Sequence, residues 1–283
     1  MSETTGQVHI EKDWVKMSVE DAKSLFWFVH MHKAGGTTIV KCAEKNHEIL
    51  TDSGNGNILE EDGTEIDYRA LDGDGLRSLV SRLLNGGVTF VASEFSVPNL
   101  EVLLAHPQVK VFTFLREPGA RFLSNFRYDY QHQFFRGDCD WTTFFRHKEQ
   151  SFYYENYYTR ILSRVLTGNL RQKDCERAYE MIKSFDFVGV LEDERSWSCF
   201  FEWAGWEPVR LNANSSSDRR AFFRYLKRPK KWGAAYRMAR FSPPPPEDFN
   251  KVWNLLNESD MRIYRWAQEE LRSAESRQAP IEG

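Results

Sequence analysis

The stretch that decides the fold is Leu25–Thr38, with the sequence LFWFVHMHKAGGTT. Its first part, LFWFVHM at 25–31, is apolar and aromatic except for His30 and has the length of a buried strand. A Gly-Gly turn follows at Gly35 and Gly36, and the residues after it, 37–46, favour a helix. The stretch therefore predicts a strand, a loop and a helix in direct succession.

Apolar runs of strand length recur along the chain and alternate with helical patterns. Further strands are expected at 88–93, 109–115 and 187–191, and helices at 75–84, 97–105 (started by Pro98), 117–130 and 193–204, with helical pieces between 141 and 185. Strands that alternate with helices predict an α/β fold with a parallel sheet and crossover connections. Ligands of such sheets bind at the carboxyl ends of the strands, where loops lead into helices.

The rest of the chain predicts loops and one long helix. Residues 52–75 are rich in Gly, Asp and Asn and favour a loop or insertion, and 207–243 are loop-rich and basic. A final helix is expected over 247–272, and Asp260 lies on its apolar face, where a carboxylate should be paired or should cap a helix. We expect one domain over 1–283, with a core of about 25–271 and flexible termini.

Composition limits the class of protein. The 283 residues are 41% hydrophobic, which allows a packed core. No apolar run approaches the roughly 20 residues of a membrane span, and residues 1–15 lack the apolar core of a signal peptide, so we expect a soluble, cytoplasmic protein. The four scattered cysteines predict reduced thiols and no metal site; they are Cys42, Cys139, Cys175 and Cys199.

Charge is unevenly distributed although the net charge is only −3. The segment 219–240 holds nine bases and no acid, which indicates either an anionic partner or a solvated surface. No nucleic-acid-binding motif accompanies it, so nucleic acid is not the expected partner.

The loop His32–Thr38 has the composition of an anion cradle. Gly35 and Gly36 let the backbone approach a ligand closely, and Thr37 and Thr38 add hydroxyls. The helix that follows supplies free N–H groups and the positive end of its dipole, while Lys33 adds a charge. An ATP-binding P-loop has its lysine at the helix start, whereas Lys33 precedes the glycines. The alternative is a plain turn between strand and helix.

A second candidate site follows the strand at 109–115, with the sequence REPGARFLS at 116–124. Arg116 stands at the strand end, where its guanidinium can bind a phosphate bidentately, and Pro118 suits a first helical turn. Ser124 follows eight residues later on the helix, and Arg121 could serve structure instead. Two anion sites at neighbouring strand ends suit a nucleotide that carries phosphates at both 5′ and 3′ positions.

On these residues the chain resembles the sulfotransferase family, most closely its Golgi carbohydrate branch typified by heparan sulfate 6-O-sulfotransferase. The resemblance implies a three-layer sulfotransferase fold and the donor 3′-phosphoadenosine-5′-phosphosulfate (PAPS), with the product PAP. It assigns Lys33, Ala34, Gly35, Gly36, Thr37 and Thr38 to the 5′-phosphosulfate, and Arg116 and Ser124 to the 3′-phosphate. Stretches at 155–162, 185–192 and 256–264 are also similar.

The chain departs from that branch at three positions. Glu117 stands in place of Asp, His32 in place of a proline, and Glu94 at the position of the branch's catalytic histidine. We expect Glu94 to be the catalytic base, or else a carboxylate that caps the helix near Pro98. His32 and His30 are the reserve candidates, His32 as a loop residue that touches the donor and His30 as a core strand residue. Lys33 should neutralise charge on the leaving oxygen.

The acceptor is left open between a small soluble metabolite and a glycan, and between O- and N-sulfation. The aromatic residues Phe152, Tyr153, Tyr154, Tyr157 and Tyr158 could stack on a sugar or belong to the core. The rival functions are a P-loop-type kinase and a non-catalytic nucleotide-binding module. The sequence does not define an oligomeric state.

Overall fold

The structure, a computed structural model, describes most of the chain between residues 24 and 278. The described residues are 24–51, 57–60, 62–94, 97–132, 155–209, 226–229, 232–233, 236, 245, 247 and 249–278. Much of the predicted basic segment 219–240, Cys139 and the aromatic residues at 152–154 therefore lie outside the described residues.

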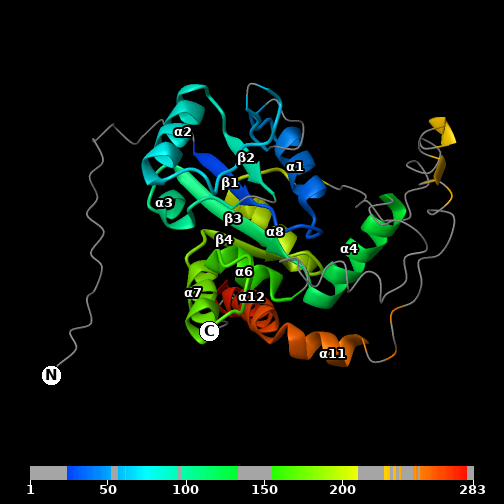
Figure 1. Ribbon diagram of the computed structural model, residues 1–283. Helices are drawn as coiled ribbons and strands as arrows, with labels where there is room; N and C mark the ends of the chain where they lie inside the picture. Colours follow the sequence, from blue (N-terminus) through cyan, green and yellow to red (C-terminus); the bar gives the residue numbers. More distant parts are fainter. Residues whose placement is uncertain are drawn as a thin grey trace.

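Four parallel strands form the sheet at the centre of the molecule (Figure 1). Its order is β2-β1-β3-β4, and the strands are β1 (Leu25–Val29), β2 (Phe90–Ser93), β3 (Val109–Leu115) and β4 (Phe187–Val190). Phe28 of β1 is in register with Ala92 of β2 and with Phe112 of β3. The predicted α/β class and parallel sheet are confirmed, although β1, β2 and β4 are slightly shorter than expected.

Helices cover both faces of the sheet (Figure 1). They are α1 (Gly36–Lys45), α2 (Gly73–Asn85), α3 (Leu100–Leu104), α4 (Pro118–His132), α6 (Tyr157–Ser163), α7 (Gln172–Lys183), α8 (Glu194–Ala204), α11 (Phe249–Leu256) and α12 (Glu258–Gln278). Side chains of α1 and α8 pack on one face, and those of α2, α3, α6, α7 and α12 pack on the other. Both faces of the sheet are thus buried, which explains why β1 is an unbroken apolar run.

Alternating residues of β1 serve the two faces. Leu25, Trp27 and Val29 belong to the larger apolar cluster, beneath α2, α3, α6, α7 and α12. Phe26 and Phe28 belong to an aromatic cluster with α1 and α8, in which Phe28 stacks on the ring of Phe112 at 5.1 Å. This alternation follows from the two-residue repeat of a strand.

The final helix predicted over 247–272 is two helices with a break at Asn257. Asn257 is buried, its Oδ1 accepts from the backbone N–H of Asn156, and its Nδ2 donates to the carbonyl of Trp253. The backbone N–H of Asn257 also donates to the carbonyl of Trp253, so its side chain adds bonds at the junction of the two helices. The second helix also continues to Gln278, so the expected end at Arg272 is wrong.

The start of α3 also differs from the expectation. Pro98 was expected in its first turn, but the helix begins at Leu100 and Asn99 is its N-cap, with the side chain accepting from the N–H of Glu101. Asparagine is a favoured N-cap because its oxygen satisfies a free N–H of the first turn.

The strand order places a topological switch point at the carboxyl ends of β1 and β3. These two strands are neighbours, yet the chain leaves β1 through α1 on one face and leaves β3 toward α6 and α7 on the other. Such a reversal of direction opens the space above the sheet edge where ligands of α/β proteins bind. Both predicted anion loops lie at these two strand ends.

Candidate functional site

The loop after β1 is shaped by two glycines. Gly35 has a φ of 87°, a left-handed conformation that favours glycine, and it is the N-cap of α1. At Gly36, a Cβ would lie 1.9 Å from Nε2 of His30, so a larger residue cannot be accommodated without a shift of that ring. The Gly-Gly pair is therefore a requirement of this local geometry.

The first turn of α1 has backbone N–H groups without hydrogen-bond acceptors. Thr38 and Ile39 donate to the carbonyl of Gly35, whereas the N–H groups of Gly36 and Thr37 have no acceptor in the described part of the chain. Ala34 is buried, Thr37 is exposed and Thr38 is half-buried. Gly36 itself is buried, but the N–H groups without acceptors and the helix dipole make this end favourable for an anion.

The loop after β3 is held by its own glutamate. The Glu117 carboxylate accepts hydrogen bonds from the N–H groups of Gly119 and Ala120, and so caps α4, which begins at Pro118. A glutamate can therefore occupy this position, where the resembled family has aspartate.

Arg116 joins the two loops. Its Nη1 donates to the carbonyl of Lys33 at 3.4 Å, and its Nε lies 3.5 Å from Oε1 of Glu192. Its side chain is 30% exposed, so part of it remains accessible to solvent. Lys33 and Arg116, predicted as parts of two separate anion sites, thus lie together.

Two consecutive tyrosines of α6 fix the backbones of both loops. The Tyr157 hydroxyl accepts from the N–H of His32 at 2.9 Å. The Tyr158 hydroxyl accepts from the N–H of Arg116 at 3.0 Å and donates to the carbonyl of the same residue at 2.6 Å. Both side chains are fully buried, so the suggestion that Tyr157 and Tyr158 stack on a sugar is wrong.

Two further polar residues of the second motif, Arg121 and Ser124, differ in their surroundings. Arg121 is 1% exposed, and its guanidinium lies 4.2 Å from the ring centre of Tyr157, a cation–π contact inside the protein. Ser124 is half-buried on α4, and no contact within the described ranges brings it to Arg116 or Lys33. Its expected role at a 3′-phosphate stays a prediction.

Glu94 lies between two histidines at the carboxyl end of β2. Its Oε1 is 2.7 Å from Nδ1 of His32, and its Oε2 is 3.3 Å from Nδ1 of His30. Its backbone N–H donates to Oδ1 of the buried Asn57. Glu94 therefore does not cap the helix near Pro98, and that alternative is wrong.

Burial and charge set the protonation of this cluster. Burial would raise the pKa of Glu94, but the electrostatic interaction with His30 and hydrogen bonds from both histidines outweigh it and lower the pKa to about 2. Burial lowers the pKa of His32 below 6.5, although Glu94 opposes the change. At neutral pH, Glu94 is a carboxylate and His32 is uncharged.

Residues of α4 complete the site, and sequence reasoning missed them. The Lys33 ammonium lies 3.9 Å from the ring centre of Tyr128, and Nε2 of His32 is 3.2 Å from Oδ1 of Asn125. Burial lowers the pKa of Lys33, while the charges of Glu94 and Asp129 oppose this change. Asn125 and Tyr128 follow Arg121 of the second motif at helical spacing, which was the available signal for this face.

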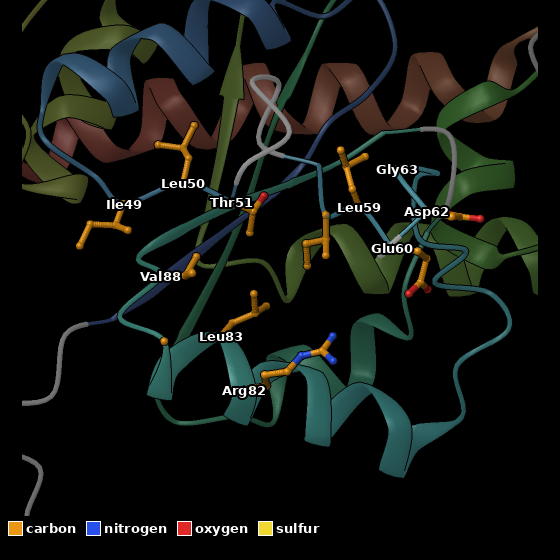
Figure 2. Close-up of a pocket in the computed structure, with 12 residues that line it drawn as sticks. Ile49, Leu50, Thr51, Leu59, Glu60, Asp62, Gly63, Arg82, Leu83 and Val88 are labelled. Carbon is orange, nitrogen blue, oxygen red and sulfur yellow. The ribbon is translucent and has the colours of Figure 1, made fainter.

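A groove of about 910 Å³ lies elsewhere, beside the amino end of β2 (Figure 2). Figure 2 shows Arg82 and Leu83 of α2 on one side of it and Thr51 and Leu59 on the other. Glu94 follows the opposite end of the same strand. The groove is thus separate from the cluster at the carboxyl ends.

Metal ligands and membrane spans were sought in the described part of the chain. It contains no group of three or more His, Cys, Asp or Glu side chains arranged to hold a metal ion. Its three cysteines, Cys42, Cys175 and Cys199, carry thiols and not disulfides. None of the helices there has both the length and the apolar character needed to cross a membrane.

Comparison of the whole chain with protein-family models and with the sequences of curated proteins found no match. Arguments about function therefore rest on the residues and geometry described above.

Proposed function

We propose that this protein is an enzyme that transfers a sulfuryl group from PAPS to a hydroxyl or amine of an acceptor. The observation that carries the proposal is the meeting of the two loops, where Nη1 of Arg116 donates to the carbonyl of Lys33 at 3.4 Å. Two cationic side chains and a helix N-terminus then lie at neighbouring strand ends, which suits a nucleotide with two separate anionic groups.

The proposed roles follow from position. The N–H groups of Gly36 and Thr37 would bind the 5′-phosphosulfate, with Lys33 beside the oxygen that leaves sulfur. Arg116 would bind the 3′-phosphate by exchanging its partly exposed ion pair with Glu192 for a stronger phosphate contact, with Ser124 further along α4. Ala34, Gly35 and Thr38 complete the phosphosulfate loop of the proposed sulfotransferase fold.

Transfer also needs a group that takes the acceptor's proton. Glu94, His30 and His32 form a connected acid–base cluster next to Lys33, because Glu94 contacts both imidazoles and its charge acts on the lysine. A positioned base typically contributes ~10²–10⁴-fold to the rate. The mechanism needs no metal, since Lys33 and the loop donors supply the stabilising charge.

The acceptor is proposed as a small metabolite, with a glycan as the alternative. Of the nine bases at 219–240 that could hold a sulfated glycan, only Lys227 and Arg228 lie in the described residues, and both are exposed. Sulfate transfer to a panel of phenols, amines and oligosaccharides would separate these classes.

The turnover of labelled PAPS tests the proposal. We expect the wild type to release sulfate or a sulfated product from [³⁵S]PAPS, and Lys33→Ala to lose at least ~10²-fold in rate with its fold intact, since a charge stabiliser of the transition state is removed. Lys45→Ala is the matched control, because this exposed lysine ends the helix that follows the loop and should leave the rate unchanged. A near-normal rate in Lys33→Ala would overturn the donor-loop assignment.

A further inference from the structure

His30 is held above the proposed donor loop by contacts on three sides. Its ring stacks on Phe28 with centres 5.2 Å apart and planes at 19°, and its Nδ1 lies 3.3 Å from Oε2 of Glu94. Its Nε2 lies where a Cβ of Gly36 would be, against the first residue of α1. The ring therefore has one fixed orientation, with Nδ1 toward the carboxylate and Nε2 toward the N-terminus of α1.

The other two members of the cluster have their proton-accepting atoms engaged. Each oxygen of Glu94 contacts a histidine, Oε1 at 2.7 Å and Oε2 at 3.3 Å. Both nitrogens of His32 have side-chain partners, Nδ1 with Glu94 and Nε2 with Asn125 at 3.2 Å. Within the described residues, Nε2 of His30 has no hydrogen-bond partner, and the side chain retains 13% of its exposure.

We propose that Nε2 of His30 is the base that accepts the acceptor's proton, and that Glu94 is a positioning residue that keeps the proton on Nδ1. This inference rests on the proposed function. A carboxylate at one imidazole nitrogen fixes the tautomer, leaves a lone pair on the other nitrogen and stabilises the imidazolium that forms. His30 follows β1 directly, so the rigid strand positions it.

The proposed step transfers one sulfuryl group to the acceptor and one proton to His30. A lone pair of the acceptor oxygen or nitrogen forms a bond to sulfur, and the bond from sulfur to the bridging oxygen of PAPS breaks. That electron pair leaves with PAP, whose new charge faces Lys33, and the proton moves to Nε2 of His30. Solvent then takes the proton, so the sulfate ester or sulfamate, PAP and one proton are the products.

Gly36 links this role to the donor loop. Because the imidazole occupies the space of a missing side chain at the first residue of α1, the base lies directly beside the proposed phosphosulfate cradle. A general base must be within hydrogen-bond reach of the proton that it removes, and this packing supplies that proximity.

The pH dependence of turnover should depend on the contact between His30 and Glu94. The ionisable groups that bear on His30 are Glu94 after β2 and, through Glu94, His32 and Lys33 of the loop, with Arg121 and Asp129 of α4 acting on those two. A base must be unprotonated, so the rate should fall on the acid side. Loss of the Glu94 charge disfavours the imidazolium, so Glu94→Gln should move the acid-side midpoint to lower pH.

The experiment measures PAP release from PAPS with water as the acceptor, together with calorimetric binding of PAP. His30→Gln keeps a polar side chain of similar size and should lose ~10²–10⁴-fold in rate, with PAP affinity within threefold of the wild type. His47→Gln is the control and should leave the rate unchanged, because this exposed histidine follows the opposite end of α1.

Each outcome is decisive. Equal rates in the wild type and His30→Gln, with PAP bound by both, would overturn the role of His30 and leave the donor site standing. An acid-side midpoint unmoved in Glu94→Gln would overturn the positioning role of Glu94. Failure of the wild type to bind PAP would overturn the proposed function and this inference with it. If His30→Gln does not fold, the profile of Glu94→Gln still decides the pairing.

Discussion

At the scale of single residues, the site depends on what Gly36 lacks. The His30 ring fills the volume where a side chain at Gly36 would begin, with Nε2 at 1.9 Å from that position. The neighbouring Gly35 is needed for a different reason, since its φ of 87° strains any residue with a Cβ. Two adjacent glycines thus serve two separate physical demands.

The substitution Gly36→Ala tests whether the His30 ring needs the space at this position. Gly36→Ala should lower the free energy of unfolding by about 1–3 kcal/mol, the usual cost of overpacking, and should lower PAPS turnover because His30 or α1 must move. Gly73→Ala is the control, since Gly73 also begins a helix and its nearest neighbour, at 3.3 Å, is the flexible end of Arg77. Urea unfolding measures the effect, and equal stability of the two variants would contradict the account.

At the scale of elements, α6 is the part that holds the two loops at a fixed separation. Its own first turn is fixed by α12, because the Asp260 carboxylate accepts from the N–H groups of Tyr158 and Thr159 and from the Thr159 hydroxyl. Asp260 is buried, and burial raises its pKa against the effect of these hydrogen bonds. The chain of contacts therefore runs from α12 through α6 to both loops.

Removal of that carboxylate should destabilise the protein. Asp260→Ala leaves two buried N–H groups without their acceptor, while the Thr159 hydroxyl keeps its contact with Ser259, and each unsatisfied group costs about 1–3 kcal/mol. We expect the free energy of unfolding to fall by about 3 kcal/mol or more, and hydrogen exchange to increase at His32 and Arg116. The control is Glu258→Ala, an exposed acid in the same first turn of α12. A decrease of less than 1 kcal/mol in the free energy of unfolding of Asp260→Ala would contradict the proposed role of this carboxylate in fixing α6.

Elements with strong local patterns were predictable, and those set by distant contacts were not. The sequence placed the four strands, the helix after Gly36 and the need for a partner at Asp260, because period, glycines and an acid on an apolar face are local signals. The break at Asn257 was missed because the apolar period continues across it, while its cause is a contact with Asn156. Tyr128 was missed as a site residue for the same reason, and Tyr157 and Tyr158 were expected to stack on a sugar or to join the core, not to hold the loop backbones.

The candidate site was predictable in outline. The motifs identified Lys33, Arg116 and Glu94, but the sequence could not show that Glu94 lies between two histidines, since His32 and Glu94 are 62 positions apart. Ser124 was predicted from its motif, and the structure brings it to neither loop. Spacing along a chain thus identified the groups, and only the fold shows their partners.

At the scale of the whole molecule, the sheet order determines where these groups meet. Because β1 lies between β2 and β3, the ends of these strands deliver Glu94, the Lys33 loop and Arg116 to one edge of the sheet. Buried ionisable groups at that edge also tie stability to pH. The free energy of unfolding should therefore vary with pH through the ionisable groups of the site.

Stability should fall as the pH is lowered. The pKa of Glu94 is about 2 in the folded protein against an ordinary 4.5, so its contribution, about 3 kcal/mol, is complete above pH 4.5 and is lost as the pH falls toward 2. Burial lowers the pKa of His32 below 6.5, so the unfolded chain binds that proton first and stability also declines below pH 6.5. The raised pKa of Asp260 acts in the opposite sense, as the folded state binds its proton first.

The Glu94→Gln variant tests how much the Glu94 carboxylate contributes to this pH dependence of stability. Its free energy of unfolding, measured in urea from pH 7 to pH 2.5, should fall less steeply below pH 4.5 than that of the wild type. Glu101→Gln, at an exposed position of α3, should keep the wild-type slope. Parallel curves for wild type and Glu94→Gln would show that the cluster is not coupled as described.

The central claim is that the two loops form one clamp for a nucleotide with separate 5′ and 3′ anionic groups. Isothermal titration of the wild type with PAP, AMP and ATP tests it most directly. The account predicts that PAP binds more tightly than either AMP or ATP, and that Arg116→Ala removes the preference for PAP over AMP. Tighter binding of ATP than PAP, or equal affinity for PAP and AMP, would contradict it.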